Sequence, residues 1–192
     1  MNPGPGAVVG IDAGCRSRDE VEHLIGRAVS LLAEPVLACT HIVRTPAPHW
    51  AASIRSTGPL PTAADLSAAL DDAAVCVLRA GSAVVAGAAS GRVGAELAAA
   101  DLLAGRAARA VFFEGQDRLP DVVPVDDLPG LCAIDEIVGL AGTPVAGQLL
   151  HTRGLVRPEL VDGRLVLLVR PYGDDLAPFE VPNPTPCCAA HG

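Results

Sequence analysis

The sequence predicts an α/β fold, because apolar runs of strand length alternate along the chain with segments of helical periodicity. Ala7 to Asp12 and Val36 to Val43 are such apolar runs, and the segment between them repeats apolar residues at helical spacing. Half of the 192 residues are hydrophobic, which is enough for one sizeable core. Because strands that alternate with helices favour βαβ units, we expect a mainly parallel sheet.

Two helix starts are marked by capping residues. Ser17 and Glu20 have the spacing of a capping box, and Thr62 and Asp65 repeat this logic at the start of a helix expected to run to about Leu78. The other elements predicted from apolar runs are strands at 83–86, 110–113 and 165–169 and helices at 94–104, 134–140 and 145–151.

Prolines define the predicted loop and tail. The segment 44–61 contains four prolines and is expected to be a loop that carries His49 and Trp50. Residues 7–170 are expected to form a single domain, and residues 171–192 a proline-rich, poorly ordered tail. Cys187, Cys188 and His191 in that tail could bind a soft metal, but adjacent cysteines alone do not complete a tetrahedral site.

The charge balance excludes several classes of function. With 14 basic and 22 acidic residues the net charge is −8, which argues against nucleic acid or an anionic membrane as the main partner. Every basic residue is arginine, so a Walker-type phosphate loop, a Schiff-base lysine and a Ser-x-x-Lys nucleophile are all excluded. Neither a signal peptide nor a membrane span is predicted, and we expect a cytoplasmic protein with free cysteine thiols.

A glycine-rich turn between a strand and a helix is the main candidate site. Gly87, Gly91 and Gly94 allow close approach of the backbone to a ligand, at the positive end of the following helix dipole. The spacing differs from the dinucleotide-binding fingerprint, and a tight structural turn is an equally good interpretation. Glu96 follows as a candidate general acid/base, although helix-end electrostatics also explain a carboxylate there.

Residues 83–112 resemble the central segment of the enoyl-CoA hydratase/isomerase (crotonase) superfamily. In that family a strand leads into a glycine-rich turn, a Glu-Leu pair, an alanine-rich helix, an aspartate and an Ala-x-Phe sequence. The matching residues are Gly91, Gly94, Glu96, Leu97, Asp101, Ala110 and Phe112. Weaker similarity extends over roughly residues 7–156. The resemblance implies a crotonase-like α/β domain built from repeated ββα units.

The resemblance also implies a chemistry. Two backbone amides of an oxyanion hole would stabilise the enolate of an acyl-CoA thioester, one from Gly91, Val93 or Gly94 and the other near Ala51. Glu96 and Glu114 would be the catalytic acid/base residues. Coenzyme A would enter as part of the substrate, without a separate cofactor or metal, and the protein would form a homo-oligomer or a hetero-oligomer with a related enzyme.

Departures from the family pattern leave a second function open. Arg92 and Val93 occupy the turn where the family has small residues, and the C-terminal helices of the family are absent. A non-catalytic accessory subunit that binds and stabilises a partner enzyme, as in actinobacterial secondary metabolism, is therefore the alternative. Two shorter similarities are Cys39-Thr40-His41, which resembles the cysteine motif of glutamate racemases, and Gly14-Cys15-Arg16, which resembles a cobalamin-biosynthesis family.

Overall fold

The computed structural model describes residues 7–44, 46–79, 82–106, 108–143 and 145–181. It divides into two compact units. Unit 1 contains the chain up to Glu114 together with Glu159–Arg164, and unit 2 contains Gly115–Pro158 and the chain from Leu165 onward. The tail residues Cys187, Cys188 and His191 lie outside the described residues. No described helix has both the length and the apolar character needed to cross a membrane.

Unit 1 is a mixed α/β structure, which confirms the predicted class. Its elements are β1 (Ala7–Cys15), α1 (Arg18–Leu31), β2 (Pro35–Val43), β3 (His49–Ser56), α2 (Ala63–Ala69), β4 (Ala74–Arg79), β5 (Ser82–Ala86), the 3₁₀ turn η1 (Ala89–Gly91), α3 (Arg92–Leu103), β6 (Ala108–Phe113) and β10 (Glu159–Val161). The strand order is β5-β4-β1-β3-β2-β6-β10.

The predicted parallel sheet is wrong, because every neighbouring pair of strands in unit 1 is antiparallel. Two of the strands missing from the prediction, β3 and β4, explain the error. β3 lies inside the predicted proline-rich loop, and β4 lies where α2 was expected to continue. β3 inserts between β1 and β2, which are joined by α1, and so produces the β4-β1-β3-β2 order of a ferredoxin-like split βαβ arrangement.

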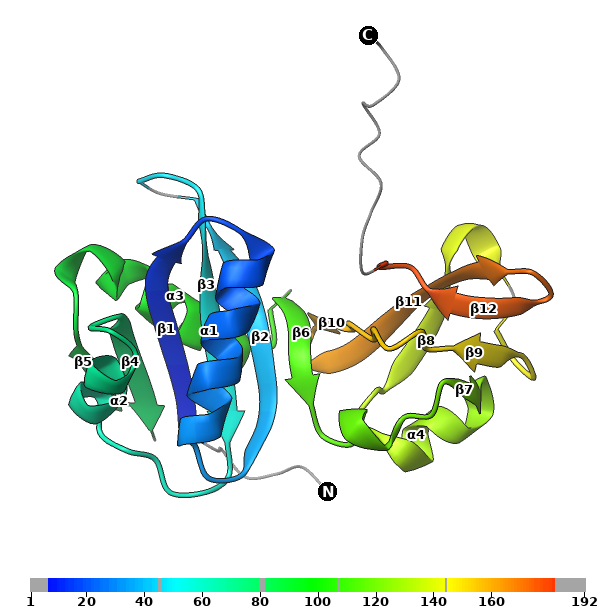
Figure 1. Cartoon of the computed structure of the whole chain (residues 1–192), viewed down its shortest axis with the longest axis horizontal. Helices are drawn as coiled ribbons and strands as arrows, with labels where there is room; N and C mark the ends of the chain where they lie inside the picture. Colours follow the sequence, from blue (N-terminus) through cyan, green and yellow to red (C-terminus); the bar gives the residue numbers. More distant parts are fainter. Residues whose placement is uncertain (1–6, 45, 80–81, 107, 144, 182–192) are drawn as a thin grey trace, which may run out of the picture. The chain divides into compact units, whose positions relative to one another are not determined.

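Helices cover both faces of the unit 1 sheet, with α1 in front of it and α3 behind it in Figure 1. Val9 and Ile11 of β1 pack in one core with residues of α1 and α2. Gly10, between them, points to the opposite face, where an added Cβ would collide with the Ala95 carbonyl of α3. The alternation of side chains along β1 therefore separates the two helical layers.

The predicted helix starts are confirmed in unit 1. The Ser17 hydroxyl accepts a hydrogen bond from the Glu20 amide, and Thr62 and Asp65 form a complete capping box at α2. The helix α2 is shorter than predicted, because Asp71 and Asp72 adopt left-handed backbone conformations with φ of 56° and 61°. This turn ends the helical segment and starts β4.

Unit 2 is dominated by short strands. Its elements are β7 (Val122–Pro124), α4 (Leu128–Leu131), β8 (Glu136–Gly139), β9 (Leu149–His151), β11 (Arg164–Tyr172, with its first residue in unit 1) and β12 (Asp175–Pro178), together with three 3₁₀ turns, Gln116–Arg118, Val125–Asp127 and Leu140–Gly142. β12 pairs antiparallel with β11 and parallel with β9, and β8 pairs parallel with β11.

Two expectations for this part of the chain need correction. The predicted helices at 134–140 and 145–151 contain the strands β8 and β9, because their apolar residues find partners in β11 and β12. The tail predicted from residue 171 begins with ordered structure. Arg170, Pro171 and Tyr172 pair with β12 across a turn at Gly173, where φ is +63°.

Candidate functional site

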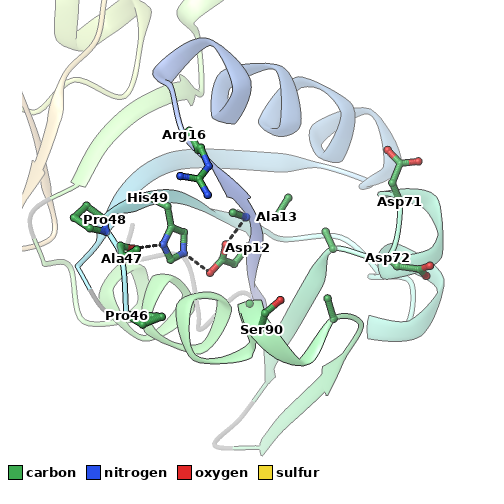
Figure 2. Close-up of a pocket in the computed structure, with 14 residues that line it drawn as sticks. Asp12, Ala13, Arg16, Pro46, Ala47, Pro48, His49, Asp71, Asp72 and Ser90 are labelled. Carbon is green, nitrogen blue, oxygen red and sulfur yellow. Dashed lines mark hydrogen bonds and ion pairs between the residues drawn. The ribbon is translucent and has the colours of Figure 1, made fainter.

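A pocket of about 300 Å³ opens at the carboxyl end of β1, where several connections of unit 1 meet (Figure 2). Its walls come from the β1–α1 connection, the segment 46–49 before and at the start of β3, the turn 71–73 and the turn 88–91 that leads into α3. Each wall follows or precedes a strand, so the sheet and its helices position the lining groups.

The floor of this pocket, called the β1 pocket below, holds a carboxylate paired with an imidazole. The Asp12 side chain is 1% exposed, and its Oδ2 lies 2.8 Å from Nε2 of His49, whose side chain is 16% exposed. The other Asp12 oxygen, Oδ1, accepts a hydrogen bond from the Gly14 amide at 2.8 Å. Both oxygens of the buried carboxylate therefore have donors, as a buried charge requires.

The hydrogen bonds of His49 indicate that it carries a positive charge. Its Nδ1 lies 2.8 Å from the Ala47 carbonyl oxygen, which can only accept, so this nitrogen donates. Its Nε2 donates to the Asp12 carboxylate. The hydrogen bond to Ala47 and then the one to Asp12 raise the pKa of His49 above its ordinary value. This geometry suits an imidazolium–carboxylate ion pair.

Other charged groups line the same pocket (Figure 2). The Arg16 guanidinium lines the pocket and makes no hydrogen bond or ion pair with the described residues. Asp71 is already paired with Arg27, at 2.7 Å. Asp72 is exposed on a different wall of the pocket. Since Asp12 is neutralised by His49, Arg16 is the cation on the lining that is left for a ligand.

The local backbone explains why Asp12 reaches His49. The β1–β3 pairing shifts register between Ile11 and Cys15, a β-bulge that redirects the side chains of the bulged strand. On the other side, Gly94 of α3 leaves space for the Asp12 carboxylate, which an added Cβ at this position would overlap. Gly91 is likewise packed against the Asp12 backbone.

The glycine turn predicted as the site does form part of this pocket. Gly91 lines it, together with Ser90 of the same turn. Gly94 is buried against Asp12, and Val93 is 60% exposed on α3. Ala51 lies in the central strand β3, opposite His41, and packs with Ala98 of α3. Ala51 does not line the pocket, so the structure packs the turn and Ala51 against different parts of α3 and does not bring them together at one site.

The two predicted acid/base residues are not brought together. Glu96 is exposed on α3 and close enough to Cys76 of β4 to raise the pKa of that thiol, although burial contributes more. Glu114 is exposed after β6, and its amide donates to the Val36 carbonyl of β2. Two strands separate β4 from β2, which corresponds to about 14 Å at the usual strand spacing.

A second polar cluster is buried beneath α3. Nε2 of His41 lies 2.6 Å from the Ser53 hydroxyl, and its Nδ1 lies 3.9 Å from Asp101, too far for a hydrogen bond. The order Ser-His-Asp matches a catalytic triad, but Ser53 is 0% exposed and does not line the β1 pocket. Cys39 of the racemase-like motif is also fully buried, which raises the pKa of its thiol to about 12 and prevents thiolate formation.

Asp12, His49 and Arg16 were not predicted as site residues. The sequence feature that could have indicated them is an aspartate at the end of an apolar strand, followed closely by an arginine. Functional side chains are often found at strand ends in α/β folds. His49 was assigned to a loop, and its pairing with a residue 37 positions away depends on β3 lying beside β1.

The described residues contain no group of three or more His, Cys, Asp or Glu side chains placed to hold a metal ion. In comparisons with known proteins, no family model, curated protein or solved structure matches this chain.

Proposed function

We propose that this protein binds a small organic anion in the β1 pocket. The observation that carries the proposal is the Arg16 guanidinium, which faces a pocket whose buried carboxylate is already neutralised by His49. A ligand carboxylate or phosphate would form charge-assisted hydrogen bonds with this guanidinium. The position of Asp72 favours a ligand whose other end is neutral or cationic.

The turn 88–91 supports the same ligand class. It leads directly into α3, a helix of 12 residues, and places the positive end of the helix dipole on the pocket side. Ser90 and Gly91 line the pocket there, so the Ser90 hydroxyl is available on a different wall from Arg16 (Figure 2). A volume of about 300 Å³ suits a small acid or the end of a larger ligand.

Acyl-CoA thioesters are the first ligands to test, because of the resemblance of residues 83–112 to the crotonase superfamily. The enzymatic version of the proposal is hydration or isomerisation through an enolate, with Glu96 as acid/base. Its support is the order of motif residues and the presence of Gly91 on the pocket wall. The alternative version is a non-catalytic accessory subunit that binds a related enzyme.

Calorimetric titration with crotonyl-CoA, coenzyme A and crotonate tests the binding proposal. Arg16→Gln should weaken binding of the anion by about tenfold, the effect of losing one charge-assisted hydrogen bond. Arg79→Gln is the matched control, because Arg79 lies at the far end of β4 from the pocket. Equal affinities of wild type and Arg16→Gln for every ligand would refute the assignment of the pocket.

Catalysis is tested separately with crotonyl-CoA hydration. The enzymatic version expects turnover by the wild type, and loss of turnover with retained binding in Glu96→Gln. Glu136→Gln, an exposed substitution in unit 2, is the control. Absence of turnover together with co-purification of a partner enzyme would favour the accessory subunit. The proposal that Arg16 binds an anion would be unaffected by this result, because the calorimetric titration tests it separately.

A further inference from the structure

The strand β5 forms one edge of the unit 1 sheet (Figure 1). It pairs with β4 on one side, and no other described strand lies beside it on the other side. Its outward backbone N–H and C=O groups therefore have no strand partner among the described residues. An open edge of this kind is a template for pairing with a further strand.

β5 lacks the features by which proteins usually protect an edge strand. Its sequence, Ser-Ala-Val-Val-Ala, contains neither a charged residue nor a proline. All five residues pair with β4 in one unbroken register, so no β-bulge turns the edge away. Ser82, Ala83 and Val84 are exposed, and the exposed fraction of Val84 is 58%. This edge is therefore accessible to another chain.

Both sides of the edge strand are apolar. Val85 is opposite Cys76 of β4, which is in turn opposite Gly10 of β1, on the side of the sheet that α3 covers. Val84 is opposite Val77, which packs in the same core as residues of α2. Because neighbouring residues of a strand point to opposite faces, Val84 extends the α2 side of the sheet and Val85 extends the α3 side.

An exposed leucine of α3 adds to this apolar surface. Glu96 is close enough to Cys76 of β4 to act on its thiol, so the Glu96 side of α3 is the side towards β4 and the edge. Leu103 follows Glu96 by seven residues and therefore lies on the same side of the helix. Its side chain is 56% exposed, although it lies on the edge side of a packed helix.

The side chains of β5 are complementary to those of a second copy of the same strand. In an antiparallel pair with its two-fold axis at Val84, this residue lies opposite Val84 of the second copy. Ala83 lies opposite Val85 of the second copy, so that a small side chain meets a larger one. Apolar pairs that are directly opposite each other stabilise a sheet. The two copies therefore cover the valine that each leaves exposed to solvent.

Charges near the two ends of β5 favour the same arrangement. Ser82, at one end, pairs with Arg79. Just beyond the other end, the Ala88 amide donates a hydrogen bond to the carbonyl of Asp72, whose side chain is exposed. Antiparallel pairing brings the basic end of one edge beside the acidic end of the other, whereas parallel pairing would bring like charges together. The charge pattern therefore favours a second copy in antiparallel orientation.

We propose that β5 is a dimer interface, at which two copies of this chain join their unit 1 sheets by antiparallel pairing of Ser82–Ala86 about a two-fold axis at Val84. Each copy uses its single β5 edge, so association stops at the dimer. Five residues span about 17 Å, which places this interface at or below the roughly 1,200 Å² typical of stable complexes. We therefore expect a dissociation constant in the micromolar range.

Sedimentation velocity of the full chain, from about 1 µM to about 1 mM, tests the dimer. The wild type should change from the mass of one chain to that of two. Val84→Lys and Val84→Glu each place like charges on the axis and should raise the dissociation constant at least about tenfold. Their urea midpoints, measured at the lowest concentration, should match the wild type because the side chain is exposed. Val161→Lys is the matched control, an exposed valine of β10 at the other end of the unit 1 strand order, and should dimerise like the wild type.

An equimolar mixture of Val84→Lys and Val84→Glu tests the register. Opposite charges would then meet on the axis, so the mixture should dimerise more tightly than either variant alone. A wild type that stays monomeric throughout, or Val84 variants that dimerise as tightly as the wild type, would overturn the proposal. So would a mixture no tighter than the separate variants, because Val84 would then not lie opposite its own copy.

Discussion

Two histidines of unit 1 have pKa values shifted in opposite directions, and the cause in each case is local. Burial lowers the pKa of His41 from 6.5 to about 4, because the imidazolium would lose its hydration under α3, and nearby Asp101 only partly offsets this. Hydrogen bonds to Ala47 and Asp12 raise the pKa of His49. The first histidine is a neutral member of the core, and the second is the cation of the candidate site.

The His41 shift predicts a loss of stability in acid. Between pH 6.5 and 4 the unfolded chain binds a proton that native His41 does not, so the free energy of unfolding falls as the pH falls, by up to about 3 kcal/mol. His41→Gln removes the imidazole that binds this proton in the unfolded chain. Urea unfolding at pH 7 and pH 4.5 should therefore show a smaller difference in the variant than in the wild type. An equal difference in both proteins would contradict the burial of a neutral His41.

The His49 shift predicts the opposite dependence. Its folded pKa lies above the ordinary value, so its stabilisation is complete below about pH 6.5 and is lost as the pH rises through the folded pKa. Asp12→Asn removes the anionic partner and should lower the pKa of His49, measured by NMR titration of the imidazole resonances. The wild-type protein, titrated in parallel, provides the reference. A His49 titration unchanged by Asp12→Asn would exclude the ion pair.

At the scale of elements, α3 packs against β1 through small residues. Gly94→Ala places a methyl group onto the Asp12 carboxylate. We therefore expect the free energy of unfolding to fall by about 2 kcal/mol, despite the better helix propensity of alanine. Gly26→Ala in α1 is the matched control, since no atom lies within 4 Å of the added methyl group. The free energy of unfolding of this control should rise by about 0.5–1 kcal/mol. Urea unfolding measures both, and equal shifts would argue against close packing of α3 on β1.

The helix α2 depends on its N-terminal cap. Thr62 and Asp65 exchange side-chain and backbone hydrogen bonds at the start of this seven-residue helix. Thr62→Ala should cost about 1 kcal/mol, as is typical for loss of an N-cap. Ser30→Ala, near the end of α1, is the control, because Ser30 bonds only to the Arg27 carbonyl one turn earlier. A comparable loss in both variants would show that the cap has no special contribution.

At the scale of the whole molecule, each unit carries one aromatic reporter. Trp50 lies in unit 1, and Tyr172, the only tyrosine, lies in unit 2. We expect Gly94→Ala to lower the urea midpoint reported by Trp50 fluorescence more than the midpoint reported by the ¹⁹F resonance of fluorotyrosine at position 172. The reason is that the substitution disturbs a contact inside unit 1. Equal shifts of both midpoints would show that the units unfold as one.

Local signals in the sequence were sufficient for several elements of unit 1. The capping residues at Ser17 and Thr62 mark the two helix starts, and apolar runs mark β1, β2, β5 and β6. β3 and β4 were missed because their neighbours carry contrary signals. Prolines precede and follow β3, and the left-handed turn at Asp71 and Asp72, which separates α2 from β4, has no glycine to reveal it.

The sequence by itself determined the α/β class, the two capped helices and the glycine-rich turn between a strand and a helix, because each depends on residues close together in the chain. Only the tertiary structure decided the antiparallel strand order, and with it the Asp12–His49 pair. Inserting β3 between β1 and β2 brings residues 37 positions apart into hydrogen-bonding distance. Sheet register is set by packing across the whole unit, which local periodicity does not encode.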